Sequence, residues 1–342
     1  MRAPFAIVGA GMAGLGAAYE LLRRGVEVEL FDKGRSAGGR VATRRVERWQ
    51  FDHGAQFFTV RDEAFAAVIA PLEAAGTVVR WLGPFRQRGP AGSGQDPRPD
   101  TERYVAVPGM SALPAALARG LKVECGQRVE RLAHAGDGWW LRLQPAATGP
   151  AGAAGDAVVR GPFAGVIVTL PPAQTAALCE LSSVDGPLAA LVATQREALQ
   201  PCLAAMVAFA APVPEAAGGW FVADSILGWV AHDGGKPGRA AAPTYVLHGA
   251  PAWSRQHVDV EPQAAAAALL DAFGRLWGRP LPPVEHLSGH RWRYALAAAE
   301  AVPATGLFDP VRRLAVAGDG YTGGRVEAAW CSGVRAARQL LG

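Results

Sequence analysis

The sequence has 342 residues, of which half are hydrophobic and 19% are charged. This composition provides ample apolar material for buried cores and excludes an intrinsically disordered chain. The 34 lysines and arginines slightly outnumber the 30 aspartates and glutamates, giving a net charge of +4, which favours an anionic ligand such as a dinucleotide. The arginines are scattered rather than massed with aromatic residues, so we expect no nucleic acid partner. The length is typical of two domains.

Glycine, proline and charged residues interrupt every apolar run, so no stretch is long enough to span a bilayer. The four cysteines show no C-x-x-C pair and no zinc-ligand spacing, and we expect reduced cysteines and no metal. The apolar stretch from Pro4 to Tyr19 contains four glycines and lacks the basic region of a signal peptide. These features predict a cytoplasmic protein with no membrane partner.

The first thirty residues predict a βαβ unit. Phe5–Val8 is a short apolar run of the buried-strand type, and an alanine- and leucine-rich helix follows it and ends near Gly25. The segment 26–31 alternates as a second strand. A strand, a helix and a second strand in this order are one half of a doubly wound parallel sheet.

Later segments predict further elements. Strands are predicted at 139–143, 158–159, 163–170, 204–209, 244–248 and 314–318, and a helix at 263–276. The two strands at 139–143 and 158–159 have the appearance of a hairpin, and the mixture between about 173 and 300 is typical of an inserted α+β domain. The stretches 85–101 and 146–156 are rich in glycine, proline or charge, and we expect them to be exposed loops.

A glycine motif lies between the first strand and the first helix. The predicted phosphate-binding residues are Gly9, Gly11, Met12, Ala13 and Gly14. Glycines allow the backbone to approach a pyrophosphate, and the N–H groups at the helix N-terminus receive its charge. Asp32 ends the second strand, where a carboxylate can accept hydrogen bonds from an adenosine ribose. The order of these features predicts a dinucleotide site.

A second glycine turn, Ser36-Ala-Gly-Gly-Arg40, follows the second strand. It would bring a flexible turn and a guanidinium beside the same pyrophosphate. A simple NAD dehydrogenase has no use for this turn, so the turn favours FAD as the cofactor. Without the neighbouring glycine motif, the same residues would indicate an ordinary turn with a surface arginine. No second Gly-x-Gly-x-x-Gly follows a strand, so we expect electrons to come from the substrate rather than from a separate NADPH domain.

Several motifs together resemble the monoamine-oxidase-like flavoprotein superfamily. These are Gly9-x-Gly11-x-x-Gly14, Asp32, Gly38-Gly39-Arg40, Asp52-His-Gly-Ala-Gln56 and Gly318-Asp319. Within the superfamily, the chain is most similar to bacterial renalase-like proteins. The segments that carry this similarity are Phe31-Asp-Lys33, Gly54-Ala-Gln-Phe-Phe-Thr59, Pro108-Gly-Met-Ser-Ala112, Trp253-Ser-Arg-Gln256, His290-Arg-Trp-x-Tyr-Ala295 and Gly323-Gly-Arg-Val-Glu327. His53 departs mildly from the family pattern.

The resemblance implies an α/β fold with a discontinuous Rossmann-like FAD-binding domain and an inserted α+β substrate domain. The FAD-binding domain would comprise residues 1–60, 104–172 and 305–342, and the substrate domain residues 61–103 and 173–304. Asp319 would meet the ribityl–pyrophosphate region, and the backbone of Val129 the adenine side. The implied FAD-binding set is completed by Lys33, Gly39, Arg40, Gln56, Arg325, Val326 and Glu327. Cys331 lies on the last helix rather than in the segment that carries the cysteine in covalent members, so we expect noncovalent FAD.

The resemblance also implies an activity. It is the oxidation of misreduced dihydronicotinamide isomers, the 2- and 6-dihydro forms of NAD(P), by hydride transfer to flavin, with O2 as acceptor and H2O2 as product. Loss of hydride makes the ring an aromatic cation, so orientation and exclusion of water matter more than a general base, and no catalytic residue is assigned. The candidates for contact with this small-molecule substrate are Gln56, His248, Arg291, Trp292 and Tyr294. Core packing is the alternative role for the aromatic residues and the histidine.

Two other functions are compatible with the sequence. The first is an amine oxidase or a desaturase-like flavoenzyme that acts on a biosynthetic intermediate, because the inserted domain determines specificity. The second is a non-catalytic sensor of flavin or nicotinamide.

Overall fold

The computed structural model describes residues 3–89, 92–136, 138–146, 156–213, 217–223, 225–297 and 307–342. The chain divides into two compact units. Unit 1 comprises Met1–Gly39, Pro114–Leu199 and Ala297–Gly342, and unit 2 comprises Arg40–Leu113 and Gln200–Leu296. These boundaries differ from the expected ones, because residues 40–60 and 104–113 cluster with unit 2 and residues 173–199 with unit 1.

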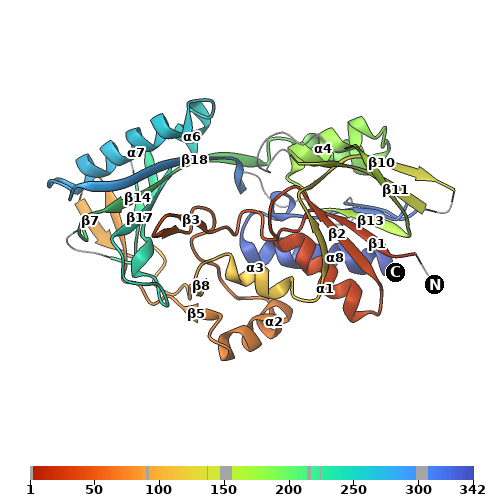
Figure 1. The fold of residues 1–342 in the computed structure, drawn as a ribbon, viewed down its shortest axis with the longest axis horizontal. Helices are drawn as coiled ribbons and strands as arrows, with labels where there is room; N and C mark the ends of the chain where they lie inside the picture. The colour runs from red at the N-terminus through yellow and green to blue at the C-terminus, as the bar shows by residue number, and fades with distance from the viewer. Residues whose placement is uncertain are drawn as a thin grey trace. The chain divides into compact units, whose positions relative to one another are not determined.

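Unit 1 is built on a six-stranded sheet with the order β19-β20-β13-β1-β2-β9 (Figure 1). Its strands are β1 (Phe5–Val8), β2 (Val28–Asp32), β9 (Lys122–Cys125), β13 (Gly165–Val168), β19 (Phe308–Asp309) and β20 (Leu314–Val316). Neighbouring strands are parallel except β19, which runs antiparallel to β20. All four residues of β1 are buried, as expected for a parallel sheet that is covered on both faces. The predicted doubly wound α/β fold is confirmed.

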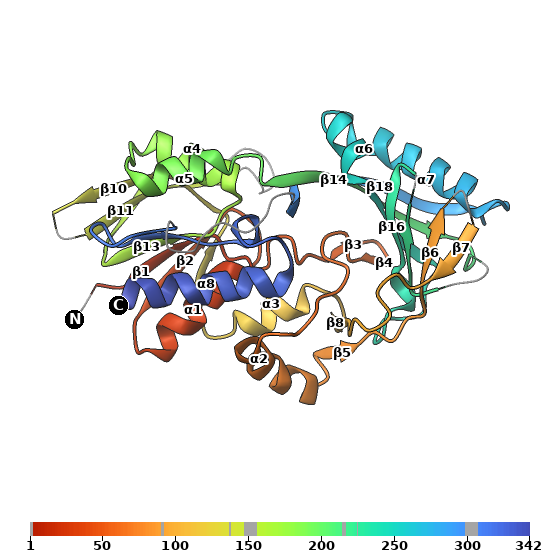
Figure 2. The same cartoon turned by 180° about the vertical axis from the view of Figure 1, so that it is seen from behind.

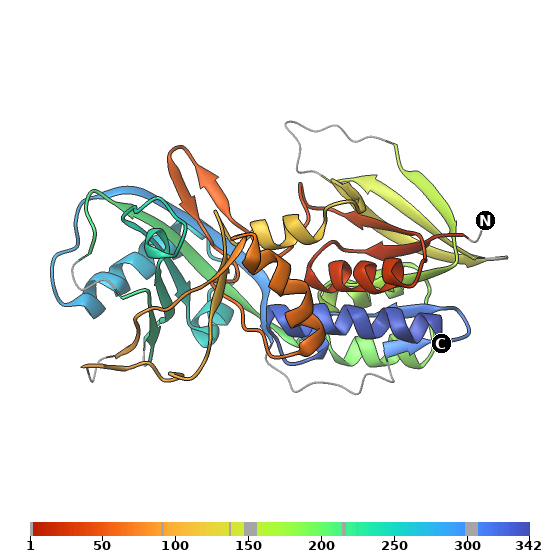
Figure 3. The same cartoon turned by 90° about the horizontal axis from the view of Figure 1, so that it is seen from below.

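Two helices pack closely on one face of this sheet, α1 (Met12–Arg23) and α8 (Val326–Leu341). Figure 3 shows them side by side as the red and dark blue helices. A Cβ at Gly16 would lie 2.3 Å from the carbonyl oxygen of Trp330, and one at Gly333 would lie 1.9 Å from that of Ala13. A side chain at either glycine would therefore force the two helices apart.

The other face of the sheet carries a three-stranded antiparallel sheet and two helices. These elements are β10 (Gln127–Ala135), β11 (Gly138–Pro145), β12 (Val158–Phe163), α4 (Pro172–Leu181) and α5 (Pro187–Thr194). The predicted hairpin is thus confirmed as the β11–β12 pair. Ala176, Leu178, Leu188 and Val192 from the two helices join the same core as Val166 and Val168 of β13. This shared core is why residues 173–199 belong to unit 1.

Unit 2 contains a seven-stranded sheet with the order β18-β14-β17-β16-β15-β6-β7 (Figure 2). The strands are β6 (Phe85–Gly89), β7 (Gly92–Gln95), β14 (Leu199–Phe209), β15 (Gly219–Val222), β16 (Leu227–His232), β17 (Thr244–Gly249) and β18 (Val284–Ala297). β6 and β15 pair in parallel, and β16 pairs antiparallel with β15 and with β17. The expected exposed loop at 85–101 is wrong in its first half, because Phe85 is buried and β6 pairs with a strand more than a hundred residues away.

The two faces of this sheet have different partners because side chains alternate along each strand. The helices on one face are α6 (Pro251–Gln256) and α7 (Pro262–Trp277). On this face, Leu203, Ala205 and Val207 of β14 pack in one core with Leu269 and Phe273 of α7. Met206, Ala208 and Val246 point to the opposite face and pack against Phe51. The second face therefore looks toward the segment that carries Asp52–Gln56.

The remaining described elements lie outside the large sheets and the helices that cover them. They are β3 (Arg44–Val46), β4 (Trp49–Phe51), β5 (Val78–Arg80), β8 (Tyr104–Ala106), α2 (Glu63–Ala74), α3 (Ala112–Leu117) and the 3-10 turns η1 (Asp233–Gly235) and η3 (Asp319–Tyr321). Most of the second expected loop, residues 147–155, lies outside the described residues. Among the helices that the structure describes, none combines the length and the apolar character needed to cross a membrane.

Candidate functional site

The turn from β1 into α1 forms a backbone cradle in unit 1. Gly9 has φ +104°, in the region that favours glycine, and a Cβ at Gly14 would lie 2.0 Å from the Gly9 carbonyl oxygen. Gly11 differs, because a Cβ there would meet no atom within 4 Å. Gly9 and Gly14 thus shape the turn itself, whereas Gly11 borders open space beside the helix start.

The N-terminus of α1 is suited to a phosphate group. Gly11 is the N-cap, so no side chain caps the helix, and the first turn contains no acidic residue. The N–H groups of the first turn lack intrahelical partners, and with the helix dipole they favour an anion. Thr169 holds the turn from behind by donating its hydroxyl to the carbonyl oxygens of Val8 and Gly9, at 3.0 and 2.9 Å.

Asp32 at the end of β2 fixes the same cradle. Its Oδ2 accepts a hydrogen bond from the Ala10 N–H and its Oδ1 accepts one from the Gly34 N–H, each at 2.6 Å. Each oxygen retains acceptor capacity for a ribose hydroxyl. The sequence predicted the ribose role but not these bonds, which join the glycine turn to the end of β2.

The second glycine turn lies against the first one. The Gly38 N–H donates to the Ala10 carbonyl oxygen at 2.9 Å, and Gly39 has φ +56°. A Cβ at Gly39 would lie 3.5 Å from the Cα of Gly11. The turn therefore lies against the cradle, and its contact with a pyrophosphate remains a prediction.

Two basic residues next to these turns, Lys33 and Arg40, have partners elsewhere in their own units. Lys33 donates to Gln174 Oε1 at 3.4 Å, and burial together with Arg128 lowers the pKa of its ammonium group, opposed by Asp32. Arg40 clusters with unit 2, where its Nη1 donates to the Ala295 carbonyl oxygen at 2.9 Å. The predicted pyrophosphate role of Arg40 remains a prediction.

Five further predicted FAD residues lie on unit 1 elements, whereas Gln56 belongs to unit 2. Asp319 is buried at the start of η3, and the Gly324 N–H donates to its carbonyl oxygen at 3.0 Å. Arg325 is the N-cap of α8 at φ +92°, so Val326 and Glu327 open that helix without a side-chain cap. Val129 lies on β10 opposite Leu143, next to a bulge.

In unit 2, the turn Asp52–Gln56 is bound through its backbone. The His53 carbonyl oxygen accepts from Trp292 Nε1 at 2.9 Å and from His248 Nε2 at 3.1 Å. The bond to a carbonyl requires the Nε2–H tautomer of His248. The Ala55 N–H donates to the Arg40 carbonyl oxygen at 3.0 Å, and the Gln56 amide donates to the Asp52 and Gly54 carbonyls.

The ring of His53 forms a stack with two residues of β18. It stacks on Trp292 with centroids 5.1 Å apart at 29°, and meets His290 edge-on at 4.7 Å. The His53 side chain is 6% exposed, and its Nδ1 has no hydrogen-bond partner among the described residues. Arg44 Nη2 lies 3.4 Å from His290 Nδ1. We call His53, His248, His290 and Trp292 the ring cluster.

The imidazoles of the ring cluster are neutral at pH 7. Burial lowers the pKa of His53 to about 3, with further lowering by His290 and Arg44. Burial also lowers the pKa of His248 to about 4 and, together with Arg44, that of His290 to about 4. The cluster therefore offers flat, uncharged rings beside a fixed cation.

The two remaining substrate candidates, Arg291 and Tyr294, lie on opposite faces of β18. Tyr294 is on the same face of β18 as Trp292, because the two are two residues apart. Arg291 is on the other face, where its Nη1 donates to the Val258 carbonyl oxygen at 2.9 Å. Four of the five predicted residues thus lie on the turn or on strand faces directed to it, and Arg291 does not.

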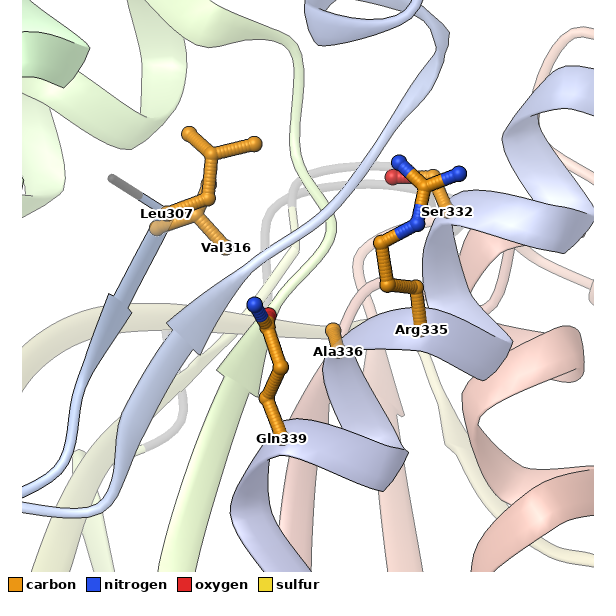
Figure 4. A pocket seen from close by; sticks show the side chains of 6 residues that line it. All are labelled: Leu307, Val316, Ser332, Arg335, Ala336 and Gln339. Carbon is orange, nitrogen blue, oxygen red and sulfur yellow. The ribbon is translucent and has the colours of Figure 1, made fainter. Parts of the chain in front are cut away.

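A small pocket in unit 1 includes none of the glycine-turn residues in its lining (Figure 4). It is lined by Leu307, Val316, Ser332, Arg335, Ala336 and Gln339. Its volume of about 10 Å³ is enough for one water. Ser332 accepts a hydrogen bond from the Gly318 N–H, so its hydroxyl serves the fold. The pocket is too small for a cofactor or a substrate.

Two family models match the sequence. The NAD(P)-binding Rossmann-like domain matches residues 7–71, and the flavin containing amine oxidoreductase family matches residues 93–341, well over half of the chain. The chain belongs to the flavin-containing amine oxidoreductase family. FAD is therefore the cofactor of this protein, and the predictions of a flavoprotein and of an FAD-dependent oxidoreductase are confirmed.

The relatives of this amine oxidoreductase agree with that assignment. A protein named "Putative flavin-containing monoamine oxidase AofH", from two strains of Mycobacterium tuberculosis, is 31% identical over 148 residues. The match covers 40% of this chain and 32% of the relative, so the chain matches about a third of that protein's length.

Two solved structures share the fold. "Putative protoporphyrinogen oxidase" from an Exiguobacterium species has a TM-score of 0.75 and covers 100% of both chains. Cyclohexylamine oxidase from Brevibacterium oxydans has a TM-score of 0.72 and covers 99% of both chains. Each is 14% identical to this amine oxidoreductase.

The cradle of this amine oxidoreductase fits the adenosine diphosphate part of FAD. Open space at Gly11, an uncapped helix N-terminus and the Asp32 carboxylate are the features that a pyrophosphate and a ribose require. When bound, the flavin ring accepts a hydride from the substrate.

Sequence reasoning missed His53 and His290 as members of the ring cluster. The signal available was that His53 interrupts an Asp-x-Gly turn and that His290 lies two residues before Trp292, on the same strand face.

Proposed function

We propose that this protein oxidises the 2- and 6-dihydro isomers of NAD(P), with O2 as the electron acceptor. The observation that carries the proposal is the ring cluster, in which neutral His53 and His290 rings lie against Trp292 and beside Arg44. Flat rings of this kind suit a flat dihydropyridine. A nearby guanidinium suits a substrate that carries pyrophosphate.

The reaction balances without a general base. The dihydronicotinamide loses a hydride, and one O2 and one proton are consumed as H2O2 forms. Because the product ring is an aromatic cation, the protein has to orient the donor and exclude water. The ring cluster supports the proposal, since its side chains are held by stacking and by two hydrogen bonds to one carbonyl oxygen.

The alternative of an amine oxidase or desaturase is supported by the names of the relatives. The charges around the ring cluster favour the first proposal, because an amine substrate arrives as a cation. The nearest carboxylate in the turn, Asp52, already pairs with Lys236 and Arg239. An ammonium group beside the ring cluster would be repelled by the guanidinium of Arg44. A non-catalytic sensor is the third possibility.

Anaerobic stopped-flow spectroscopy tests the proposal. Borohydride-generated dihydronicotinamide isomers should bleach the flavin absorbance far faster than 4-dihydro NADH or a primary amine. Subsequent mixing with O2 should give one H2O2 per flavin reoxidised. Reduction by the amine with inert isomers would establish the alternative, and no reduction by any donor would favour the sensor.

FAD is proposed to be noncovalent. Acid precipitation should release the yellow colour into the supernatant, whereas colour that stays with the polypeptide would show a covalent bond.

A further inference from the structure

Unit 2 contains four buried charged side chains that the proposed chemistry does not use. Lys236 Nζ lies 2.7 Å from Asp233 Oδ1 and 3.2 Å from Asp52 Oδ2, and Arg239 Nη2 lies 2.6 Å from Asp52 Oδ2. All four side chains are at most 4% exposed. Burial raises the pKa of the Asp233 carboxyl above its usual value, although the neighbouring Lys236 opposes the rise. We call these residues the ion network.

Asp52 is the centre of the ion network. Its second oxygen, Oδ1, accepts from Thr43 Oγ1 at 2.6 Å and from the Met110 N–H at 2.8 Å. Burial opposes ionisation, but Lys236 and Arg239 overcome it and keep the pKa of Asp52 below its usual range. The carboxylate thus joins three segments of unit 2 that are distant in sequence.

Lys236 holds both ends of the turn Asp52–Gln56. At the first residue it pairs with the Asp52 carboxylate, and at the last it donates to Gln56 Oε1 at 3.3 Å. The Gln56 Nε2 then donates back to the Asp52 carbonyl oxygen. Between these two fixed points lies His53, whose carbonyl oxygen is bound by His248 and Trp292.

Such a network is a poor device for stability alone. Removing two ion pairs from water carries a desolvation penalty of several kcal/mol per ion, and apolar replacements of such groups are often neutral or stabilising. What a network does provide is a single geometry, since few arrangements of the side chains satisfy directional hydrogen bonds and ion pairs at the same time. The turn that it fixes carries the His53 ring and the Gln56 amide.

We infer that Lys236 and its ion-network partners are positioning residues, which hold His53 and Gln56 in the one geometry that receives the substrate. This inference rests on the proposed function, because it takes the ring cluster as the place where the donor ring stacks. It assigns no proton or electron transfer to Lys236.

The test is a charge-balanced double variant of the full-length, FAD-loaded protein, Lys236→Met with Asp233→Asn. It removes one cation and one anion, leaves the Asp52–Arg239 pair intact, and deletes the bond to Gln56. The matched control is Arg275→Met with Asp271→Asn, which removes an exposed ion pair on α7. Thr43→Val deletes the hydrogen bond to Asp52 and the one that Thr43 accepts from the Ser111 N–H. It is the milder variant if the double variant loses FAD.

Two readouts follow. The rate constant for flavin reduction at saturating donor should fall at least about tenfold in the double variant, because lost positioning can cost up to about a hundredfold. The imidazole NMR signal of His53, assigned with His53→Phe, should titrate closer to pH 6.5 as the ring loosens. The control should change neither.

The outcomes distinguish the positioning role of the ion network from the proposed function. An unchanged rate and an unchanged His53 titration in a folded, FAD-loaded variant would overturn the positioning role. The rate is measured with whichever donor reduces the flavin, and the titration needs no donor. If the dihydronicotinamide isomers prove inert, the proposed function fails while the positioning role is still decided.

Discussion

Acid should destabilise this protein between pH 7 and pH 5, chiefly through the ring cluster. The folded pKa is about 3 for His53 and about 4 for His248 and His290, against about 6.5 for an unfolded histidine. As the pH falls through 6.5, the unfolded chain therefore binds protons that the folded protein does not. Stability is fully present above about pH 7 and is lost as the pH falls toward the folded pKa values.

The size of this loss follows from the shifts. In the pH range between 7 and 5, each histidine with a folded pKa of 4 or lower should remove about 2 kcal/mol from the free energy of unfolding. Three such residues give a loss of about 5–6 kcal/mol, a large part of the 5–15 kcal/mol typical of whole proteins. His232, whose pKa is also lowered by burial, adds to it.

Urea unfolding at pH 7, 6 and 5, followed by tryptophan fluorescence at a fixed FAD concentration, measures the effect. His53→Phe keeps a flat ring on Trp292 and should reduce the loss between pH 7 and pH 5 by about 2 kcal/mol. His134→Phe, at an exposed position on β10, is the control and should leave the loss unchanged. Equal pH dependence in His53→Phe and the unmodified protein would refute the reasoning.

Three further predictions concern single residues. Gly11→Ala should weaken FAD binding in titrations but leave the unfolding free energy of the FAD-free protein unchanged. Gly14→Ala should weaken FAD binding and also lower the unfolding free energy, because its Cβ would clash with the Gly9 carbonyl oxygen. Asp32→Ala should raise the FAD dissociation constant about 10- to 100-fold, since it removes charge-assisted hydrogen bonds; an unchanged constant would contradict this role. Trp292→Ala should slow flavin reduction by up to about a hundredfold with FAD content retained, and an unaltered rate would exclude stacking on this ring.

The sequence predicted the parts of the fold that depend on local signals. The Gly9–Gly14 turn, the strands beside it and Asp32 lie within thirty residues of one another, and glycine spacing with strand periodicity was enough to place them. The strand at Phe85 was missed because its partner, Gly219–Val222, is far away in sequence, while its own composition suggests a loop.

The ring cluster was predictable only in part for the same reason. Trp292 and His248 were candidates because each lies on a strand-like segment, but no pattern within either segment indicates that both donate to the carbonyl oxygen of His53. Lys236 lies in a short glycine-rich stretch that resembles a surface loop. It is buried because it pairs with Asp233 and with Asp52, and Asp52 is 184 residues away in sequence.

The close packing of α1 on α8 has a consequence for biosynthesis. The ribosome delivers α1 about 300 residues before α8, which at 5–20 residues per second is a delay of roughly 15–60 seconds. During that interval the face of α1 around Gly16 has no partner, and the nascent chain exposes apolar surface that chaperones recognise. Unit 1 can therefore complete its fold only after most of the chain has been synthesised. Because FAD binds the folded state, a higher FAD concentration at that stage should increase the fraction of chains that fold rather than aggregate.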